Sequence, residues 1–142
     1  MKKNNLIYFC LIYFIYAFHC QAQLGQTPEM LLQTIEENNW EYEKGKIDGL
    51  QFIEVLIPKY EESIGNYTRN TFMVFKELDV IRCSVYIITN PMVLTNKMVK
   101  DFNERFVKVD YMQWKDYEEH TIYDMEIADG NCITTVYYDF KN

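Results

Sequence analysis

The side chains with the most chemistry available to them gather between Asp110 and Gly130, in the stretch DYMQWKDYEEHTIYDMEIADG. It holds seven carboxylates, of which four form a candidate acidic patch for a cation or a basic peptide: Asp116, Glu118, Glu119 and Asp124. A calcium site needs about six to eight oxygens from a tight loop, and the spacing of an EF-hand loop is absent. Asp124 and Glu126 alternate with apolar residues, as on a sheet with one wet face. This alternation favours a solvated sheet face with a polar loop over a binding site.

Catalytic chemistry has weaker support. His120 is the one histidine after residue 22, and Ser63 and Ser84 are the serines of that part of the chain. Neither serine stands between the glycines of a nucleophile elbow. No Cys-x-x-Cys pair predicts a zinc site, and no glycine-rich loop predicts a phosphate site. We therefore assign no catalytic residue, no metal and no cofactor. One enzymatic alternative stays open, a small carboxylate-dependent hydrolase centred near His120.

Three aromatic residues recur at intervals of three: Tyr111, Trp114 and Tyr117. That spacing is irregular for a strand and fits an exposed loop whose rings form a binding surface. Packing over the edge of a sheet is the favoured alternative, because tyrosine and tryptophan suit strands. These three residues are the candidate binding loop, and burial of Trp114 would decide for packing.

Two cysteines follow residue 22, Cys83 and Cys132. Cys83 shares one predicted strand face with Ile81, Val85 and Ile87, and Cys132 lies in a similar alternation. Both sulfurs are therefore expected to point toward the core. We predict a disulfide between them, because an exported protein folds where thiols are oxidised. The alternative is two separate buried thiols that act as small hydrophobes.

The first residues predict where the protein goes. Lys2 and Lys3 precede an unbroken apolar run, Leu6 to Phe18, and Cys20-Gln21-Ala22 then offers small residues to a signal peptidase. As a helix this run rises only about 20 Å, short of a ~30 Å hydrocarbon core. Residues 1–22 are therefore predicted to be a secretory signal peptide, and residues 23–142 to form a single domain. We expect an exported protein, located in the periplasm, at the cell surface or in the medium.

The predicted mature chain is strongly acidic. The full sequence carries 21 acidic and 14 basic side chains, and loss of Lys2 and Lys3 leaves 14 − 2 = 12 basic ones, a net charge of 12 − 21 = −9. Such a surface repels nucleic acid and anionic lipid head groups. The expected partner is therefore a protein or peptide, with a basic one favoured. We expect no nucleic acid and no stable membrane span after signal cleavage.

Two helices are predicted to position these residues. In QTPEMLLQTIEENN, Thr27 suits the N-cap and Pro28 the first helical position. The apolar residues that follow recur on one helical face, and they do so again in TNKMVKDFNERF.

Strands account for most of the rest. The predicted strands are EYEK after Trp40, then LQFIEVLI, TFMVFKEL, VIRCSVYIIT, VKVDYM, TIYDMEIA and CITTVYYDF. Residues 59–70 are predicted to be a polar connection and residues 114–117 an irregular one, and no internal repeat is visible. Adjacent strand runs with few helices favour antiparallel pairing. The predicted fold is α+β, an antiparallel sheet of about five to seven strands with two helices packed on one face.

One resemblance adds to this interpretation. The signal ending QAQ, together with YMQWKDYE and IYDMEIADGNC, resembles small exported proteins of unknown function from Bacteroidota-type bacteria. The resemblance implies a periplasmic or surface location and transfers no catalytic residue. The sequence therefore favours a small non-catalytic binding or accessory domain of the cell envelope. The hydrolase near His120 remains the alternative, and a concave pocket that joins His120 to two carboxylates would distinguish it from a shallow binding surface.

Overall fold

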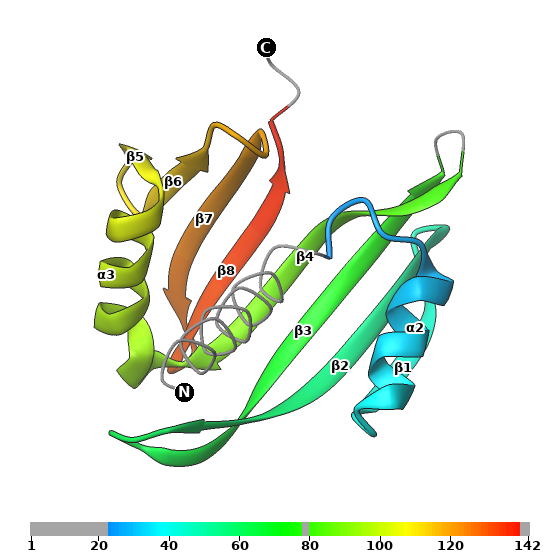
Figure 1. Ribbon diagram of the computed structural model, residues 1–142, viewed down its shortest axis with the longest axis horizontal. Helices are drawn as coiled ribbons and strands as arrows, with labels where there is room; N and C mark the ends of the chain where they lie inside the picture. Colours follow the sequence, from blue (N-terminus) through cyan, green and yellow to red (C-terminus); the bar gives the residue numbers. More distant parts are fainter. Residues whose placement is uncertain (1–22, 78–79, 140–142) are drawn as a thin grey trace, which may run out of the picture.

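The computed structural model describes residues 23–77 and 80–139 of the chain (Figure 1). The predicted signal peptide, residues 1–22, lies outside the described residues. The described elements are α2 (Pro28–Glu37), β1 (Glu41–Ile47), β2 (Leu50–Glu61), β3 (Gly65–Glu77), β4 (Ile81–Pro91), the 3-10 helix η2 (Met92–Leu94), α3 (Thr95–Arg105), β5 (Val107–Asp110), β6 (Gln113–Asp116), β7 (Thr121–Ala128) and β8 (Asn131–Tyr138). The predicted antiparallel sheet with two α-helices is confirmed for this part of the chain, but the sheet has eight strands.

The sheet is built from two halves with the same order of elements. Its strand order is β1-β2-β3-β4-β8-β7-β6-β5, and every neighbouring pair is antiparallel. The N-terminal half is α2 followed by the meander β1–β4, and the C-terminal half is α3 followed by the meander β5–β8. The last strands of the two meanders, β4 and β8, pair at the centre of the sheet. The topology therefore repeats where the sequence shows no repeat.

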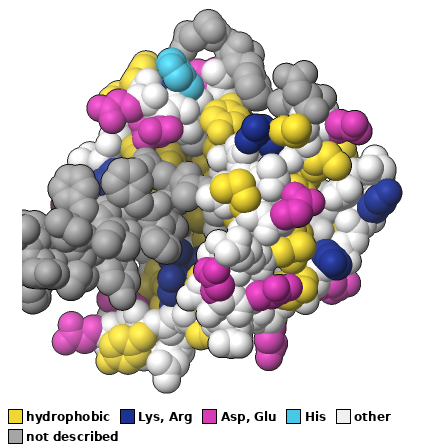
Figure 2. All heavy atoms as spheres, turned by 45° about the vertical axis from the view of Figure 1, so that its right-hand side comes forward, with side chains coloured by type: hydrophobic (Ala, Val, Ile, Leu, Met, Phe, Trp, Pro, Cys, Tyr) yellow, Lys and Arg dark blue, Asp and Glu magenta, His cyan; other side chains and the backbone are white. Residues whose placement is uncertain are grey.

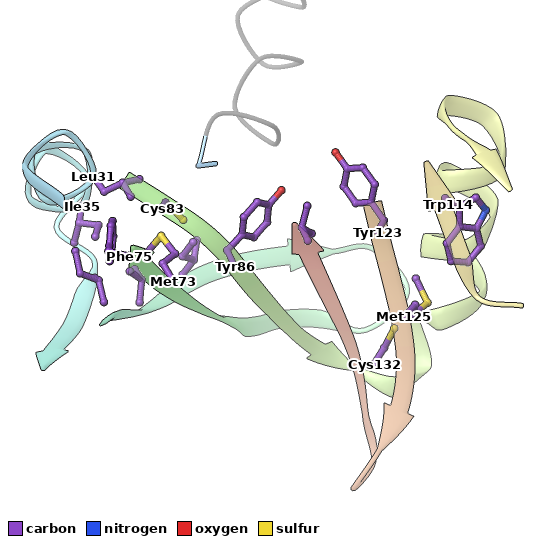
Figure 3. Close-up of a cluster of buried hydrophobic side chains, with 14 residues drawn as sticks. Leu31, Ile35, Met73, Phe75, Cys83, Tyr86, Trp114, Tyr123, Met125 and Cys132 are labelled. Carbon is purple, nitrogen blue, oxygen red and sulfur yellow. The ribbon is translucent and has the colours of Figure 1, made fainter. Parts of the chain in front are cut away.

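Both α-helices lie on the same face of the sheet, together with the buried side chains (Figure 3). Helix α2 inserts Leu31 and Ile35 into the hydrophobic cluster. Phe102 of α3 and Phe106, the residue after that helix, pack against the cluster. An apolar stripe along each helix buries itself in this way because its other positions are polar. We call this side of the sheet the helix face, and the opposite side the open face.

The start of α2 follows from its sequence as predicted. Pro28 occupies the first turn, and the backbone N–H of Met30 donates to the Thr27 hydroxyl at 3.4 Å.

Among the described residues, no helix has both the length and the apolar character that crossing a membrane requires.

The additional strand is β6, in a segment predicted to be an irregular connection. Trp114 pairs with Tyr123 of β7 and with Lys108 of β5, so this segment has strand partners on both sides. Its four residues are too few to show a clear alternation in the sequence, and the pairing of its neighbours decides its structure.

The predicted polar connection at residues 59–70 is also wrong. β2 continues through Pro58 to Glu61, and β3 begins at Gly65 after a short turn. The pairing of β1 with β2 stops at Leu56, so Pro58 lies where β2 has become an edge strand on that side. Proline is tolerated at such a position because no neighbouring strand needs its missing N–H.

A bulge in β4 changes which residues share a face. Val74 of β3 pairs with Val85, but the next residue, Phe75, pairs with Cys83, so Ser84 is the extra residue. The predicted single face of Ile81, Cys83, Val85 and Ile87 is therefore divided. After the bulge it is Tyr86 that is buried on the helix face, and Val85 lies on the open face.

Candidate functional site

The candidate binding loop does not form. Trp114 is 0% exposed on the helix face, where its indole N–H donates to Asn103 at 2.8 Å and its ring meets the edge of Phe102 at 5.3 Å. Tyr111 and Tyr117 are exposed. The three rings therefore make no common surface, and the packing alternative is correct. The sequence did carry a signal for the burial of Trp114: the two phenylalanines of the second predicted helix require apolar partners in the sheet.

The predicted acidic patch is also divided. The Asp116 carboxylate accepts the backbone N–H groups of Glu118 at 2.9 Å and Glu119 at 3.2 Å, so it closes a turn. Asp116 pairs with Thr121, which is buried on the helix face, whereas Asp124 is three residues further along β7 and lies on the open face. The four carboxylates thus do not converge on one ligand. No group of three or more histidine, cysteine or acidic side chains in the described ranges is arranged to hold a metal.

His120 lies in the same turn and is exposed. Its backbone has a positive φ of 51°, and its carbonyl accepts the N–H of Asp139 at 2.8 Å. A hollow of about 40 Å³ lies next to this turn, on the helix face. It is lined by Leu24, Tyr86, Glu119, Thr121, Tyr123 and Tyr138. Tyr86 and Tyr123 point from the central strands toward the space between α2 and α3 (Figure 3). The lining contains one carboxylate and lacks His120, so this hollow does not join His120 to two carboxylates.

The two cysteines are free thiols in the structure, so the predicted disulfide is wrong. Both are buried on the helix face as expected, but the pairing places Cys132 opposite Asn90, at the far end of β4 from Cys83. The difference 90 − 83 = 7 positions corresponds to roughly 20 Å along a strand, and a disulfide needs Cα atoms within ~7 Å. Burial raises the pKa of Cys83 to about 12 and also raises the pKa of Cys132. Both thiols are therefore unreactive hydrophobic groups.

The open face is the largest feature that the sequence analysis did not identify. The strand pairing arranges its side chains in three rows that run across the sheet. The apolar row is Gly45, Phe52, Val74, Val85, Tyr137, Ile122, Lys115 and Val107. The middle row is Glu43, Glu54, Phe72, Ile87, Thr135, Asp124 and Gln113. The third row is Glu41, Leu56, Asn70, Thr89, Ile133 and Glu126.

Aromatic rings form the most ordered part of this face. Phe52 and Phe72 stack with ring centroids 5.0 Å apart, and both are half-buried. Gly45 lies directly opposite Phe52, and a Cβ atom there would be 2.8 Å from the ring. The glycine therefore lets the Phe52 ring lie against β1, an arrangement that covers an edge-strand glycine.

Carboxylates lie at or next to both ends of the middle and third rows. Glu41, Glu43 and Glu54 stand on β1 and β2, and Asp124 and Glu126 stand on β7. Four of these five side chains are exposed, and Glu54 is half-buried, where it accepts a hydrogen bond from the Asn70 amide. These two rows contain no lysine or arginine among the residues named above.

The one basic residue of the three rows is already neutralised. The Lys115 ammonium lies 2.7 Å from the Asp139 carboxylate and 4.6 Å from the centre of the Tyr117 ring. Lys115 is 8% exposed, so this ion pair lies buried next to the end of the apolar row. The accessible charge in the three rows is therefore negative.

One signal in the sequence indicated this surface. In LQFIEVLI, Phe52 and Leu56 alternate with Ile53, Val55 and Ile57, so the strand is apolar on both sides. Both helices are predicted to pack on one face of the sheet, so they leave its other face without a helix. One side of such a strand must then face solvent or a partner.

Comparison of the chain with protein-family models, with curated proteins and with solved structures gives no match.

Proposed function

We propose that this protein is a small exported, non-catalytic binding domain of the cell envelope, and that it holds a basic protein or peptide on its open face. The observation that carries this proposal is the sheet face that no described helix covers, with half-buried apolar side chains bordered on one side by exposed carboxylates. Protein interfaces combine an apolar centre with a polar rim in this way.

The centre of the face has the character of an interface. Phe52, Phe72 and Tyr137 are half-buried, and Leu56 is 40% exposed. Aromatic side chains are enriched in interfaces because they bury a large area with few rotatable bonds. A partner that covers these rings would remove apolar area from water, at about 25 cal/mol for each Å².

The rim selects the charge of the partner. The exposed carboxylates Asp124 and Glu126 on one side, and Glu41 and Glu43 on the other, attract lysine and arginine. Charge complementarity acts mainly on specificity and on the association rate. The overall acidity of the chain has the same sign, so long-range attraction and local contacts favour the same partners.

A pair of charge-reversal variants tests the proposal. Asp124→Lys combined with Glu126→Lys changes the open face, and Glu36→Lys combined with Glu37→Lys makes the same change in charge on exposed residues of α2. Both are compared with the wild type in pull-downs from envelope extract, with each bound protein quantified. We expect the first variant to lose its basic partners and the second to retain them. Equal retention by both variants, with thermal unfolding unchanged, would overturn the proposal.

A further inference from the structure

The two outer edges of the sheet are built differently. At one edge, β5 has four residues and its pairing is interrupted by a bulge between Lys108 and Asp110. At the other edge, β1 has seven residues in unbroken register with β2, and all of them are exposed. Proteins protect open edges by short strands, bulges, proline or charge, because an open edge accepts further strands. Of these devices β1 has only charge.

The hairpin after β1 determines which backbone groups face outward. Asp48 and Gly49 have positive φ values of 50° and 82°, so they form a two-residue turn that Ile47 and Leu50 close. In such a hairpin the closing pair is hydrogen-bonded and the pairs then alternate. The N–H and C=O groups of Tyr42, Lys44 and Lys46 therefore point away from β2, toward the free edge.

The charges of β1 are separated by face. Glu41 and Glu43 pair with open-face residues of β2, whereas Lys44 pairs with Ile53, which is buried on the helix face. Lys46 lies two residues further along and shares the face of Lys44. On the side of the molecule that Figure 2 turns forward, which carries α2 and β1 in Figure 1, acidic and basic side chains lie interspersed.

This arrangement opposes a second copy of the same chain. Antiparallel pairing of two β1 strands in one continuous sheet keeps each face on its own side. Glu41 and Glu43 would then face the glutamates, the glycine or the isoleucine of the other copy, and the lysines would face lysine or tyrosine. Like charges directly across a strand pair are destabilising. A second copy therefore offers no opposite charge to any of these four side chains.

We propose that β1 is a strand-addition site for an extended segment of a partner protein. The segment pairs antiparallel with Tyr42, Lys44 and Lys46 through backbone hydrogen bonds. Its side chains alternate, with lysine or arginine toward Glu41 and Glu43 and with carboxylates toward the two lysines. Backbone bonds supply affinity in this mode of binding, and the alternating side chains supply specificity. This site shares Glu41 and Glu43 with the open-face rows proposed above, but its backbone hydrogen bonds lie at the free edge of β1, and it is tested separately.

Two peptides of the same composition test the proposal on the mature protein. VEVEKTK, aligned antiparallel to residues 41–47, places glutamates opposite Lys44 and Lys46 and lysines opposite Glu41 and Glu43. VKVKETE, aligned in the same way, places lysines opposite Lys44 and Lys46 and glutamates opposite Glu41 and Glu43. Four cross-strand pairs at a few tenths of a kcal/mol each predict that the first peptide binds roughly tenfold more tightly. Equal affinity in calorimetry would overturn the charge argument.

Backbone pairing is tested by blocking it on either side. N-methylation of the fourth residue of VEVEKTK removes the N–H that the Lys44 carbonyl accepts, and we expect it to abolish binding to the unaltered protein. Lys44→Pro should do the same, because proline at an outward-facing edge position removes a donor without breaking the sheet. Lys44→Thr keeps the donor and is expected to retain most of the affinity. Unchanged binding of the methylated peptide would refute strand addition.

The open-face variant separates the two proposals. The protein with Asp124→Lys and Glu126→Lys should bind VEVEKTK as the wild type does, because β7 lies far from β1 in the strand order. Loss of peptide binding in that variant would show that the peptide occupies the open-face rows, and would overturn the edge assignment.

Discussion

The two halves of the molecule share one order of elements but bury different side chains. The N-terminal half packs mainly aliphatic residues under α2: Leu31, Ile35, Ile53, Val55 and Ile57. The C-terminal half packs aromatic residues under α3: Phe102, Phe106, Trp114 and Tyr123. Phe106 and Tyr123 stack at 4.3 Å, and Phe102 lies 5.3 Å from both Trp114 and Tyr123.

Strand length explains the difference. The two longest strands of the N-terminal half, β2 and β3, have 12 and 13 residues, whereas β5 and β6 have four each. A four-residue strand offers only two side chains to each face. Each large aromatic side chain buries about 150–250 Å², so a few rings replace the area that longer strands would supply. The same topology is thus stabilised by length in one half and by ring size in the other.

Removal of the largest buried ring should have the largest effect. Trp114→Ala is expected to lower the free energy of unfolding by about 4 kcal/mol, since it leaves a cavity and removes the partner of Asn103. Ile53→Ala, the matched change in the N-terminal half, should cost about 3 kcal/mol. Urea unfolding of both variants provides the measurement. A larger loss for Ile53→Ala than for Trp114→Ala would contradict the assignment of ring packing to the C-terminal half.

The two thiols give a second comparison, in pH dependence. The pKa of Cys83 is raised from 9.0 to about 12 by burial, so the thiol is neutral in the folded protein where it ionises in the unfolded chain. The contribution of the Cys83 thiol to the free energy of unfolding is complete below about pH 9. It is lost as the pH rises toward 12, at about 1.4 kcal/mol per pH unit.

Cys83→Ala should therefore flatten the fall in stability above about pH 9. Cys132→Ala gives the comparison from the C-terminal half and should flatten the fall as well, because burial also raises the pKa of Cys132. Unfolding free energies measured on both variants and the wild type, at intervals from about pH 8 to about pH 11, check this expectation. Identical slopes for Cys83→Ala and the wild type would show that Cys83 ionises normally.

Mass spectrometry after alkylation should also find both cysteines modified only in the unfolded protein, because each is buried as a free thiol.

The smallest effects should lie in the acidic turn. Asp116→Ala removes the acceptor of two backbone N–H groups and should cost about 1 kcal/mol, comparable to the loss of a helix cap. Glu118→Gln combined with Glu119→Gln removes exposed charges and should change stability by less than about 0.5 kcal/mol. Thermal unfolding distinguishes the two. A large loss for the glutamine pair would mean that these carboxylates have structural partners.

The sequence was informative about elements and poor at placing them relative to one another. The N-cap at Thr27 and the alternation in β7 follow from local chemistry, and the structure agrees with both. β6 was missed because a four-residue strand is too short to show a period, and Ser84 could not be recognised as a bulge because its cause lies in the pairing with β3. Candidate sites failed for the same reason, since spacing along the chain does not say which face a residue occupies.

The sequence by itself determined the acidity of the chain, both helices, most of the strands and the burial of Cys83 and Cys132, because these depend on side-chain type and on period. Only the tertiary structure decided that Trp114 is core, that Cys132 of β8 lies beside the end of β4 far from Cys83, and that the carboxylates of β1 and β7 share the face opposite the two described α-helices. Those properties depend on strand order and register. Register is set by the packing of whole strands, and a shift of one residue would move every side chain to the other face.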